Sequence, residues 1–447
     1  MIQSKKIAIL GAGLSGITQA LNLQEEGNEV IVFDQNPEVG GVLQSKRING
    51  YLLDCGANTL SLRSQKKKAF LEKHHILEHA LDANPTSTKR FIVRNSKLVT
   101  LPQNFLSFLK SPFLSPLGKM RLLVEPFIPR KTMNIDSESM GAFVKRRLGS
   151  EVLNYAANPF IGGIYASRPE SLILKHAFPQ LCELEKQYGS LFWGLIKSKK
   201  NKDKLPQSRL ISFSEGMQEL PQRLSLNLSS SLRLGHEVTE IRRANSNEWS
   251  IVSQKEGNEV KVDYFDEIIC TLPSHRLASI EWKDLHGADL LNILAKASHP
   301  PLAMTFLGIQ KECISHPLDG FGFLVPEVEK RKILGTLFSS TLFPNRAPKG
   351  KALLTTFIGG ERNAELCKLS DKEIIDLSFE ENKSLLGISG SPEFKEIIRW
   401  PHSIPLPDLT TTERLKASAL LSDKNPGLHF SGSHLSGAPL PNCIHSP

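Results

Sequence analysis

Three glycines near the N-terminus constrain this chain more than any other feature. Gly11, Gly13 and Gly16 form the pattern G-x-G-x-x-G. An apolar stretch, Lys6–Leu10, precedes the pattern, and a helical pattern, Leu14–Glu26, follows it. A strand, a glycine turn and a helix in this order predict backbone amides that point at a phosphate. The first glycine permits the turn, the second lets a pyrophosphate approach the backbone, and the third lets the helix pack on the strand.

An acidic residue stands where a ribose would need it. Glu29–Asp34 has the pattern of a second strand, and Asp34 comes 18 residues after Gly16. In nucleotide-binding folds an acid about 20 residues beyond the glycines accepts ribose hydroxyls. The pattern predicts the first half of a Rossmann-like α/β domain and leaves FAD and NAD open. Glycine pairs in the stretches 37–41 and 50–58 would suit a long flavin dinucleotide, although each taken alone is more often an ordinary turn.

The length and the charge place further bounds on the function. The 447 residues suggest about three domains. The net charge of +9 favours anionic partners, which include acidic small molecules, lipid head groups and nucleic acid. The six cysteines have no metal-ligand spacing, so we expect reduced thiols and no metal site. No apolar run reaches the roughly 18 residues that a membrane span needs.

Several longer stretches resemble one enzyme family. They are GAGLSG, GYLLDCGANTL, KRFIV, NPFIGGIYASRPESL, GFGFLVP, LGTLFSSTLFPNRAP, FIGGERN, RWPHSIP and GLHFSGSHLSGAPLPNCI. With these stretches the chain resembles the flavin amine-oxidase superfamily and, within it, the FAD-dependent, oxygen-using protoporphyrinogen oxidases.

The resemblance implies an α/β fold with three parts. A Rossmann-like FAD-binding domain would comprise residues 1–85, 207–280 and 397–447. A substrate domain with a mixed sheet would comprise 86–101 and 281–396, and an inserted helical domain that contacts a membrane would comprise 102–206.

The resemblance also implies an activity. The family removes six electrons from protoporphyrinogen IX, with O2 as the acceptor, and yields protoporphyrin IX and H2O2 in haem synthesis. Coproporphyrinogen III oxidation to coproporphyrin III stays open, as does a cofactor-deficient, non-catalytic relative. An amine or carotenoid oxidase is the more distant alternative, because no aromatic cage or lysine for the flavin can be placed. Hydride leaves a ring carbon for the flavin, so no catalytic side chain is expected.

The matching motifs carry the family's site residues onto this sequence. Those expected to bind FAD are Gly11, Ala12, Gly13, Leu14, Ser15, Gly16, Asp34, Gly40, Gly41, Gly56, Ala57, Asn58, Val238, Trp400, Gly432, Ser433, Pro439 and Leu440. Those expected to bind substrate are Arg90, Gly163, Leu324, Leu342 and Phe357. By resemblance, Arg90 pairs with a propionate, Leu324 and Leu342 sandwich the macrocycle, and Phe357 stacks on a pyrrole. From sequence alone the two leucines and Phe357 are better explained as core residues of strands.

The sequence also departs from the family pattern. Ser167 stands where relatives often have glycine, Val42 replaces a residue that is commonly Arg or Lys, and Ser433 replaces the usual Asn. The sequence stops at Pro447, where relatives continue into a helix whose N-terminus abuts the flavin diphosphate. The loss of that helix would remove backbone donors from the cofactor site.

Apolar residues among cations predict contact with a membrane surface. The apolar ones are Phe105, Leu106, Phe108, Leu109, Phe113 and Leu114, and the cations are Lys110, Lys119, Arg121, Arg130 and Lys131. Phe105, Phe108 and Leu109 share one helical face, which also suits a protein core. We expect a cytoplasmic protein, peripheral on the inner face of the cell membrane, that binds a porphyrinogen and molecular oxygen and no nucleic acid. A hand-off of product to the next haem-pathway enzyme and a homodimer stay open.

Overall fold

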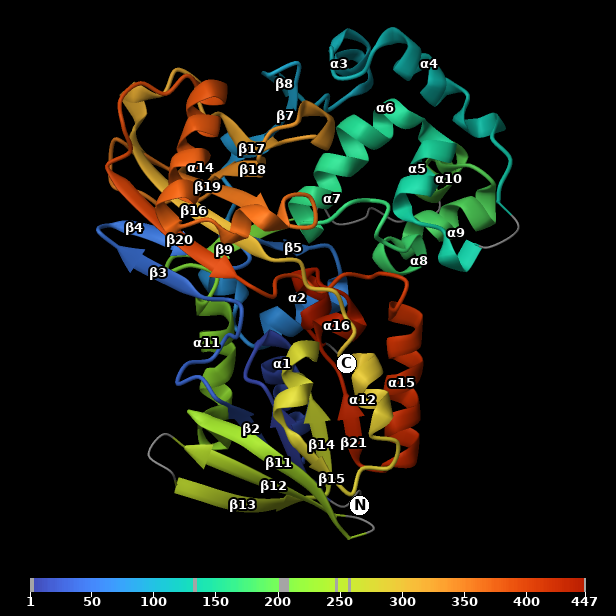
Figure 1. Cartoon of the computed structure of the whole chain (residues 1–447), viewed down its shortest axis with the longest axis vertical. Helices are drawn as coiled ribbons and strands as arrows, with labels where there is room; N and C mark the ends of the chain where they lie inside the picture. The colour runs from blue at the N-terminus through green and yellow to red at the C-terminus, as the bar shows by residue number, and fades with distance from the viewer. Residues whose placement is uncertain (1–3, 132–134, 201–208, 246–247, 256–258, 446–447) are drawn as a thin grey trace.

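The chain folds into two tiers, and the polypeptide passes from one tier to the other several times. The computed structural model describes residues 4–131, 135–200, 209–245, 248–255 and 259–445. Figure 1 shows a parallel sheet with its helices in the lower tier, and a mixed sheet beside a group of helices in the upper tier. The α/β class predicted from the sequence is confirmed.

A parallel sheet forms the centre of the lower tier. In spatial order its strands are β10 (Leu232–Leu234), β2 (Glu29–Asp34), β1 (Lys6–Leu10), β14 (Glu267–Cys270) and β21 (Leu428–Phe430). Successive residues of β1 point to opposite faces, as in any strand. Ile9 packs with α1 (Leu14–Glu25), whereas Ala8 and Leu10 pack with α15 (Thr411–Lys424). Both faces are therefore covered, and the carboxyl ends of the strands meet at the edge that faces the upper tier (Figure 1).

The strands and the helix predicted around the glycine motif are confirmed. β1 and β2 have the predicted bounds, and α1 ends at Glu25, one residue earlier than expected. A second small sheet of the lower tier is formed by β13 (Glu259–Phe265), β12 (Glu248–Lys255), β11 (His236–Asn245) and β15 (Glu281–Lys283).

A seven-stranded mixed sheet forms one side of the upper tier. Its order is β20 (Phe394–Trp400), β16 (Leu302–Gln310), β19 (Lys351–Gly359), β18 (Ile333–Phe338), β17 (Gly320–Leu324), β7 (Lys89–Arg94) and β8 (Lys97–Thr100). Helix α14 (Asp371–Leu386) covers one face, and its first turn is capped reciprocally by Ser370 and Glu373. The opposite face is directed toward the helices and the lower tier.

The helices beside this sheet are short because prolines and glycines interrupt the chain. Those with described bounds are α3 (Phe105–Lys110), α4 (Pro116–Leu123), α5 (Met140–Leu148), α6 (Ser150–Val152), α7 (Asn158–Tyr165), α8 (Leu174–Ala177), α9 (Pro179–Tyr188) and α10 (Leu191–Lys200). Pro116, Pro159 and Pro179 lie in the first turns of α4, α7 and α9, where the missing N–H costs no helical hydrogen bond. Their shared core includes Ile92 of β7, so the helices pack directly on the sheet.

The three-domain division remains a proposal, with two adjustments from strand pairing. β15 pairs with β11, so residues 281–283 belong to the lower tier and not to the substrate domain. β20 begins at Phe394, before the predicted boundary at 397. The predicted boundary at 206 and 207 lies outside the described residues.

Candidate cofactor cradle and substrate slot

The glycine loop leaves open space at one position and none at the other two. Gly11 has a φ of +105°, and a Cβ added there would lie 2.9 Å from Thr271 Oγ1. A Cβ on Gly16 would lie 1.9 Å from the carbonyl oxygen of Gly11. A Cβ on Gly13 would meet no atom within 4 Å. Gly11 and Gly16 are thus required by the turn itself, whereas Gly13 faces space that a ligand can fill.

The N-terminus of α1 opens onto that space. Gly13 is the N-cap residue, no side chain caps the helix, and the first turn contains no acidic residue. A helix that begins in this way presents unpaired amides and a partial positive charge. A diphosphate satisfies both requirements, so this helix end fits the phosphates of a dinucleotide.

Asp34 ties the end of β2 to the glycine loop. Its Oδ2 accepts a hydrogen bond from the Ala12 amide at 2.8 Å. Its Oδ1 accepts from the amide of Asn36 at 2.9 Å and from its side chain at 3.0 Å. Because a carboxylate can accept about four hydrogen bonds, Asp34 keeps capacity for a ribose hydroxyl while it fixes the loop.

A second layer of glycines closes over the first. The amide of Gly40 donates to the Ala12 carbonyl at 2.9 Å, and a Cβ on Gly41 would lie 3.3 Å from the Cα of Gly13. A Cβ on Gly56 would lie 2.0 Å from the carbonyl oxygen of Val42. The predicted glycine clusters therefore meet beside the first loop, which brings Ala57 and Asn58 to the same place.

Later segments complete the cradle from far along the chain. The Trp400 indole donates to the Cys55 carbonyl at 2.7 Å, so the end of β20 reaches the 50s loop. Gly432, with a φ of +111°, follows β21, and Ser433 begins the short helix α16 (Ser433–Ser436).

The last described residues lie against α1. The segment η11 (Leu440–Cys443) follows Pro439, and its Leu440 packs in the core cluster that contains α1. The Thr18 hydroxyl of α1 donates to the Cys443 carbonyl at 3.2 Å. Val238 lies away from this contact, on β11 next to a register shift in its pairing with β12.

One face of the seven-stranded sheet places two of the predicted substrate residues side by side. Leu324 on β17 and Phe357 on β19 are both paired with Gly335 of the strand between them. Residues in one register row point to the same face, and Gly335 has no side chain to fill the gap. Gly163 of α7 faces the same leucine, because a Cβ there would lie 2.6 Å from Leu324 Cδ2.

This apolar row lies between the helices and the cradle. Phe357 packs in a cluster with Cys55, Ala166 and Trp400, which includes residues of the cradle. Leu324 and Phe357 are half-buried, whereas true core residues of this sheet are fully buried. Both side chains therefore keep some exposed surface, and their assignment to the substrate site stays a prediction.

Leu342 has a different setting from the one expected of a strand. It closes the helical turn α13 (Ser339–Leu342) and is buried, with 1% of its surface exposed. The expectation that it belongs to a strand is wrong, because the chain leaves β18 at Phe338 and turns before β19. Its carbonyl accepts from the Asn84 amide at 2.9 Å.

Arg90 is an exposed cation at the edge of this face. It lies two residues before Ile92 on β7, and Ile92 pairs with Leu324, so the two side chains point the same way. Its guanidinium lies 4.9 Å from the centre of the Phe321 ring and donates to the Thr88 carbonyl at 3.2 Å. No carboxylate pairs with it within the described part of the chain. Arg90 is available to an acidic ligand.

Sequence reasoning missed two groups beside the site. Thr271, after β14, donates from Oγ1 to the Leu10 carbonyl at 2.8 Å and touches the glycine loop. The buried arginine Arg362 lies behind α7, in the stretch FIGGERN, of which only Phe357 was predicted as a site residue. The available signal was the pair of charged residues, Glu361 and Arg362, that follows the glycines Gly359 and Gly360.

A group of neutral histidines next to the cradle predicts acid sensitivity. Burial lowers the pKa of His434 to about 3 and that of His275 to about 4, with smaller contributions from Arg414, His299, His402 and Arg276. In the unfolded chain these rings titrate near 6.5, so between pH 6.5 and 4 the unfolded state binds more protons. The free energy of unfolding should therefore fall as the pH drops from 7 to 5 in denaturant titrations. His434→Gln should flatten this dependence, and an unchanged slope would contradict it.

The comparisons with known proteins agree with this geometry. Residues 14–446 match the flavin containing amine oxidoreductases, and the chain belongs to that family. It is 34% identical over 470 residues to a mitochondrial protoporphyrinogen oxidase of Nicotiana tabacum, covering 99% of this chain and 93% of the relative. It is 26% identical to the coproporphyrinogen III oxidase of Bacillus subtilis, covering 98% and 96% of the two chains. A crystal structure described as a putative protoporphyrinogen oxidase from Exiguobacterium has the same fold, with a TM-score of 0.80, 20% identity and coverage of 100% and 97%.

Proposed function

We propose that this protein is an oxidoreductase that uses FAD to oxidise protoporphyrinogen IX to protoporphyrin IX, with O2 as acceptor and H2O2 as product. The observation that carries the proposal is the 34% identity to protoporphyrinogen oxidases over the full chain. The apolar row Leu324–Gly335–Phe357 beside the cradle supports it, because a porphyrinogen is a large apolar macrocycle with charges only at its rim.

Some residues of the chain would hold the dinucleotide, and others would orient the substrate. The free helix end at Gly13, the Asp34 carboxylate and the glycines of the second layer would hold the dinucleotide. Bound FAD supplies the electron acceptor for each two-electron step. Leu324 and Phe357 would exclude water from one side of the macrocycle, and Arg90 would fix a propionate at its edge. No residue is assigned to acid–base chemistry.

The charges around the slot favour a substrate with few carboxylates. Of the arginines and lysines nearest to Arg90 on β7, Lys89 pairs with Asp319, and Arg94 pairs with Glu151 at 2.6 Å. Arg168, near α7, pairs with Glu327 at 2.9 Å. Each of these three cations is paired with a carboxylate, whereas Arg90 is not paired with one among the described residues. A tetracarboxylate such as coproporphyrinogen III would require more cations, so we assign the substrate with two propionates.

The decisive test is anaerobic purification followed by turnover. The protein should be yellow, with one FAD per chain, and should oxidise protoporphyrinogen IX with three O2 consumed for each porphyrin formed. Faster oxidation of coproporphyrinogen III would assign the alternative substrate. A colourless protein that cannot be reconstituted with FAD would support the non-catalytic relative and overturn the proposal.

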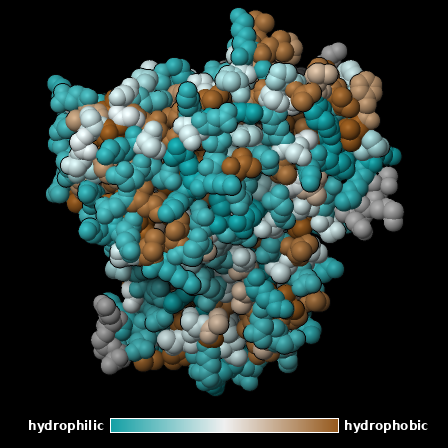
Figure 2. All heavy atoms as spheres, turned by 45° about the horizontal axis from the view of Figure 1, so that its top comes forward, coloured by the Kyte–Doolittle hydropathy of each residue, from teal (hydrophilic) through white to brown (hydrophobic). Residues whose placement is uncertain are grey.

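We also propose that the helical part rests on a membrane surface. No helix within the described residues is long and apolar enough to cross a bilayer. Exposed apolar side chains nevertheless follow one another over α3, α4, the turn η3 (Glu125–Phe127) and α10. They are Phe105, Leu106, Leu109, Leu117, Met120, Leu123, Val124, Phe127, Phe192, Trp193, Leu195 and Ile196. Figure 2 shows hydrophobic atoms gathered along the upper edge and the upper right, where these helices lie.

The predicted membrane face needs correction at three residues. Phe113 and Leu114 are buried in the helical core, and Phe108 is half-buried against the same core. Phe105 and Leu109 are exposed, at 68% and 51%. On α3 the exposed apolar residues are therefore 105, 106 and 109, because the chain turns inward after this helix.

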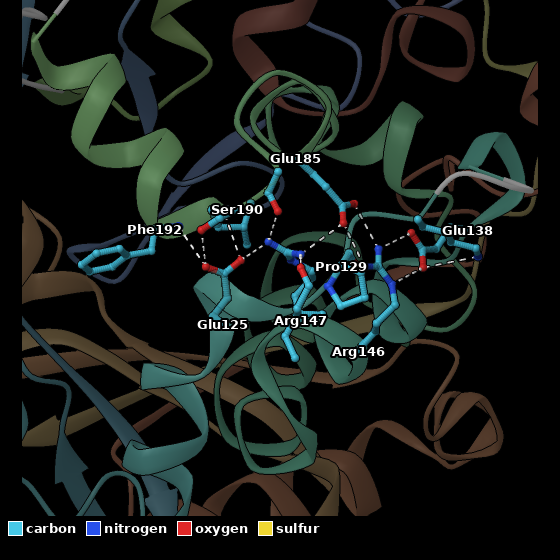
Figure 3. A network of polar contacts seen from close by, with 12 residues as sticks. Glu125, Pro129, Glu138, Arg146, Arg147, Glu185, Ser190 and Phe192 are labelled. Carbon is cyan, nitrogen blue, oxygen red and sulfur yellow. Dashed lines mark hydrogen bonds and ion pairs between the residues drawn. The ribbon is translucent and has the colours of Figure 1, made fainter.

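A buried ionic network holds this face together (Figure 3). Glu125 accepts hydrogen bonds from the amides of Leu191 and Phe192 at 2.9 and 3.1 Å, and from Ser190 Oγ at 2.6 Å. It therefore caps the N-terminus of α10 from the η3 turn. Although burial favours the neutral acid, these donors and the paired Arg147 lower the pKa of Glu125. The apolar residues of η3 and α10 are thus fixed side by side.

Removal of the exposed apolar residues should release the protein from membranes. Phe105→Ser, Leu106→Ser and Leu109→Ser together should abolish co-sedimentation with anionic vesicles. Each apolar side chain that the lipid buries contributes roughly 1.5–3 kcal/mol to membrane binding. Turnover in detergent should be unchanged because none of the three is in the described core.

A matched control lies in the lower tier. Val260 and Val262 of β13 are also exposed, so Val260→Ser with Val262→Ser should leave vesicle binding intact. Equal binding by the triple variant and wild type would remove this face from the membrane.

A further inference from the structure

A cluster of hydrogen-bonded polar side chains connects helix α7 to the sheet behind the slot. Its members are Asn158, Ser167, Arg168, Glu327, Glu361 and Arg362. Asn158 begins α7, Ser167 and Arg168 follow its end, and the other three lie in the loops after β17 and β19. Both ends of the helix are therefore fastened to the strands that carry Leu324 and Phe357.

Arg362 lies at the centre of this cluster. Its Nη1 donates to the Val325 carbonyl at 2.8 Å, and its Nη2 donates to Asn158 Oδ1 at 3.1 Å. The same amide oxygen accepts from the Glu327 amide at 2.9 Å, while Asn158 Nδ2 donates to Glu327 Oε2 at 3.1 Å. One guanidinium thus joins the residue after Leu324 to the start of α7.

The guanidinium is costly to bury and makes no direct ion pair among the described residues. Arg362 is 9% exposed, its Nε has no hydrogen-bond partner, and burial lowers its pKa to about 10. A purely apolar residue could fill this space without that cost. What only a planar fork can do is hold two acceptors on different elements at a fixed spacing.

The C-terminal end of α7 is also held by hydrogen bonds. Ser167 Oγ donates to Glu361 Oε2 at 2.5 Å, and the Arg168 amide donates to the same oxygen at 3.0 Å. The hydroxyl of Ser167 therefore belongs to this polar cluster.

The two glycines of α7 show how closely the helix approaches the sheet. A Cβ on Gly162 would lie 3.0 Å from Arg362 Nη2, and a Cβ on Gly163 would lie 2.6 Å from Leu324 Cδ2. Helix α7 therefore packs directly on Leu324, and a shift of a few tenths of an ångström in the helix displaces this side chain.

We propose that Arg362 is a positioning residue: through Asn158 and the Val325 carbonyl it sets the distance between α7 and β17, and so the width of the substrate slot. This inference rests on the proposed function of the slot. Within the described part of the chain, the side-chain hydrogen bonds of Arg362 go to Val325 and Asn158 and not to the cofactor cradle, so the loss of Arg362 should affect the binding of the planar substrate and not that of FAD.

The test compares Arg362→Met with Arg331→Met in the flavin-loaded protein. Arg331 is the matched control, because it is also largely buried with an unpartnered Nε but pairs with Glu381 of α14 at 2.6 Å, on the other face of the sheet. Arg362→Met should raise KM for protoporphyrinogen IX and weaken equilibrium binding of protoporphyrin IX by about tenfold or more, since small misplacements of a binding wall have large effects. The kcat and the FAD content should stay near those of wild type, and Arg331→Met should change none of these quantities.

Two further variants test the same contact between α7 and the sheet. Arg362→Lys can reach only one of the two acceptors and should give an intermediate KM, and it decides the question if the methionine variant does not fold. Gly163→Ala should also weaken porphyrin binding, and its effect should not add to that of Arg362→Met, because both act on one gap. Additive effects, or a KM for Arg362→Met equal to that of wild type, would overturn the inference. A wild-type protein that neither binds porphyrin nor oxidises porphyrinogen would instead overturn the proposed function.

Discussion

Gly13→Val should remove FAD from the protein while the remaining fold survives. The backbone at Gly13 has a φ of −71°, which valine adopts without strain, and an added Cβ meets no protein atom within 4 Å. The methyl groups would therefore fill the space in front of the α1 N-terminus, where the diphosphate is expected. FAD content, measured by absorbance after denaturation, should fall from stoichiometric to undetectable.

Gly16→Ala supplies the contrast for this experiment. Its Cβ would lie 1.9 Å from the carbonyl oxygen of Gly11, so the turn itself must shift. Gly16→Ala should lose both FAD and stability, whereas Gly13→Val in its flavin-free form should unfold at the same denaturant concentration as flavin-free wild type. Stoichiometric FAD in Gly13→Val would refute the placement of the phosphates.

Arg90→Ala should lower kcat/KM by about tenfold to a hundredfold, mostly through KM. A charge-assisted bidentate hydrogen bond to a carboxylate is worth roughly 1.5–3 kcal/mol, and this one is made equally in the ground state and the transition state. Arg90 has no carboxylate partner within the described residues, so its removal leaves no unpaired acid and the free energy of unfolding should change little. Lysine at this position should recover only part of the loss, because a point charge does not reproduce the planar fork.

The neighbouring lysine and an esterified substrate isolate the role of Arg90. Lys89 pairs with Asp319 at an exposed site, so Lys89→Ala should leave the kinetics unchanged. Wild type should lose efficiency on a porphyrinogen whose propionates are esterified, while Arg90→Ala should barely distinguish the ester from the acid. If both proteins discriminate equally, Arg90 does not bind the carboxylate.

The confirmed sequence predictions concern segments that are short along the chain. The strand Lys6–Leu10, the turn at Gly11 and the helix from Leu14 form one local unit, whose steric demands are visible in the glycine spacing. The strand Glu29–Asp34 follows within the same unit and has the predicted bounds. Resemblance to a family added the candidate residues of the slot, which no periodicity could have indicated.

The predictions that were wrong concern residues whose surroundings are set by distant parts of the chain. Phe113 and Leu114 continue the apolar pattern of the preceding helix, yet they are buried because the chain turns inward at Pro112. Leu342 has the pattern of a strand residue but closes a helical turn. In both cases the local composition allows two environments, and contacts with distant segments select one of them.

The nucleotide-binding unit is predictable from the sequence alone, because a tight turn between a strand and a helix requires glycine at fixed positions. The surroundings of the slot, in contrast, depend on contacts between distant segments. Leu324 and Phe357 become neighbours through strand register across Gly335, and Arg362 meets Asn158, 204 residues away, through a helix laid across the sheet. Such contacts depend on how whole elements pack, and packing between distant segments leaves no periodic trace in the sequence.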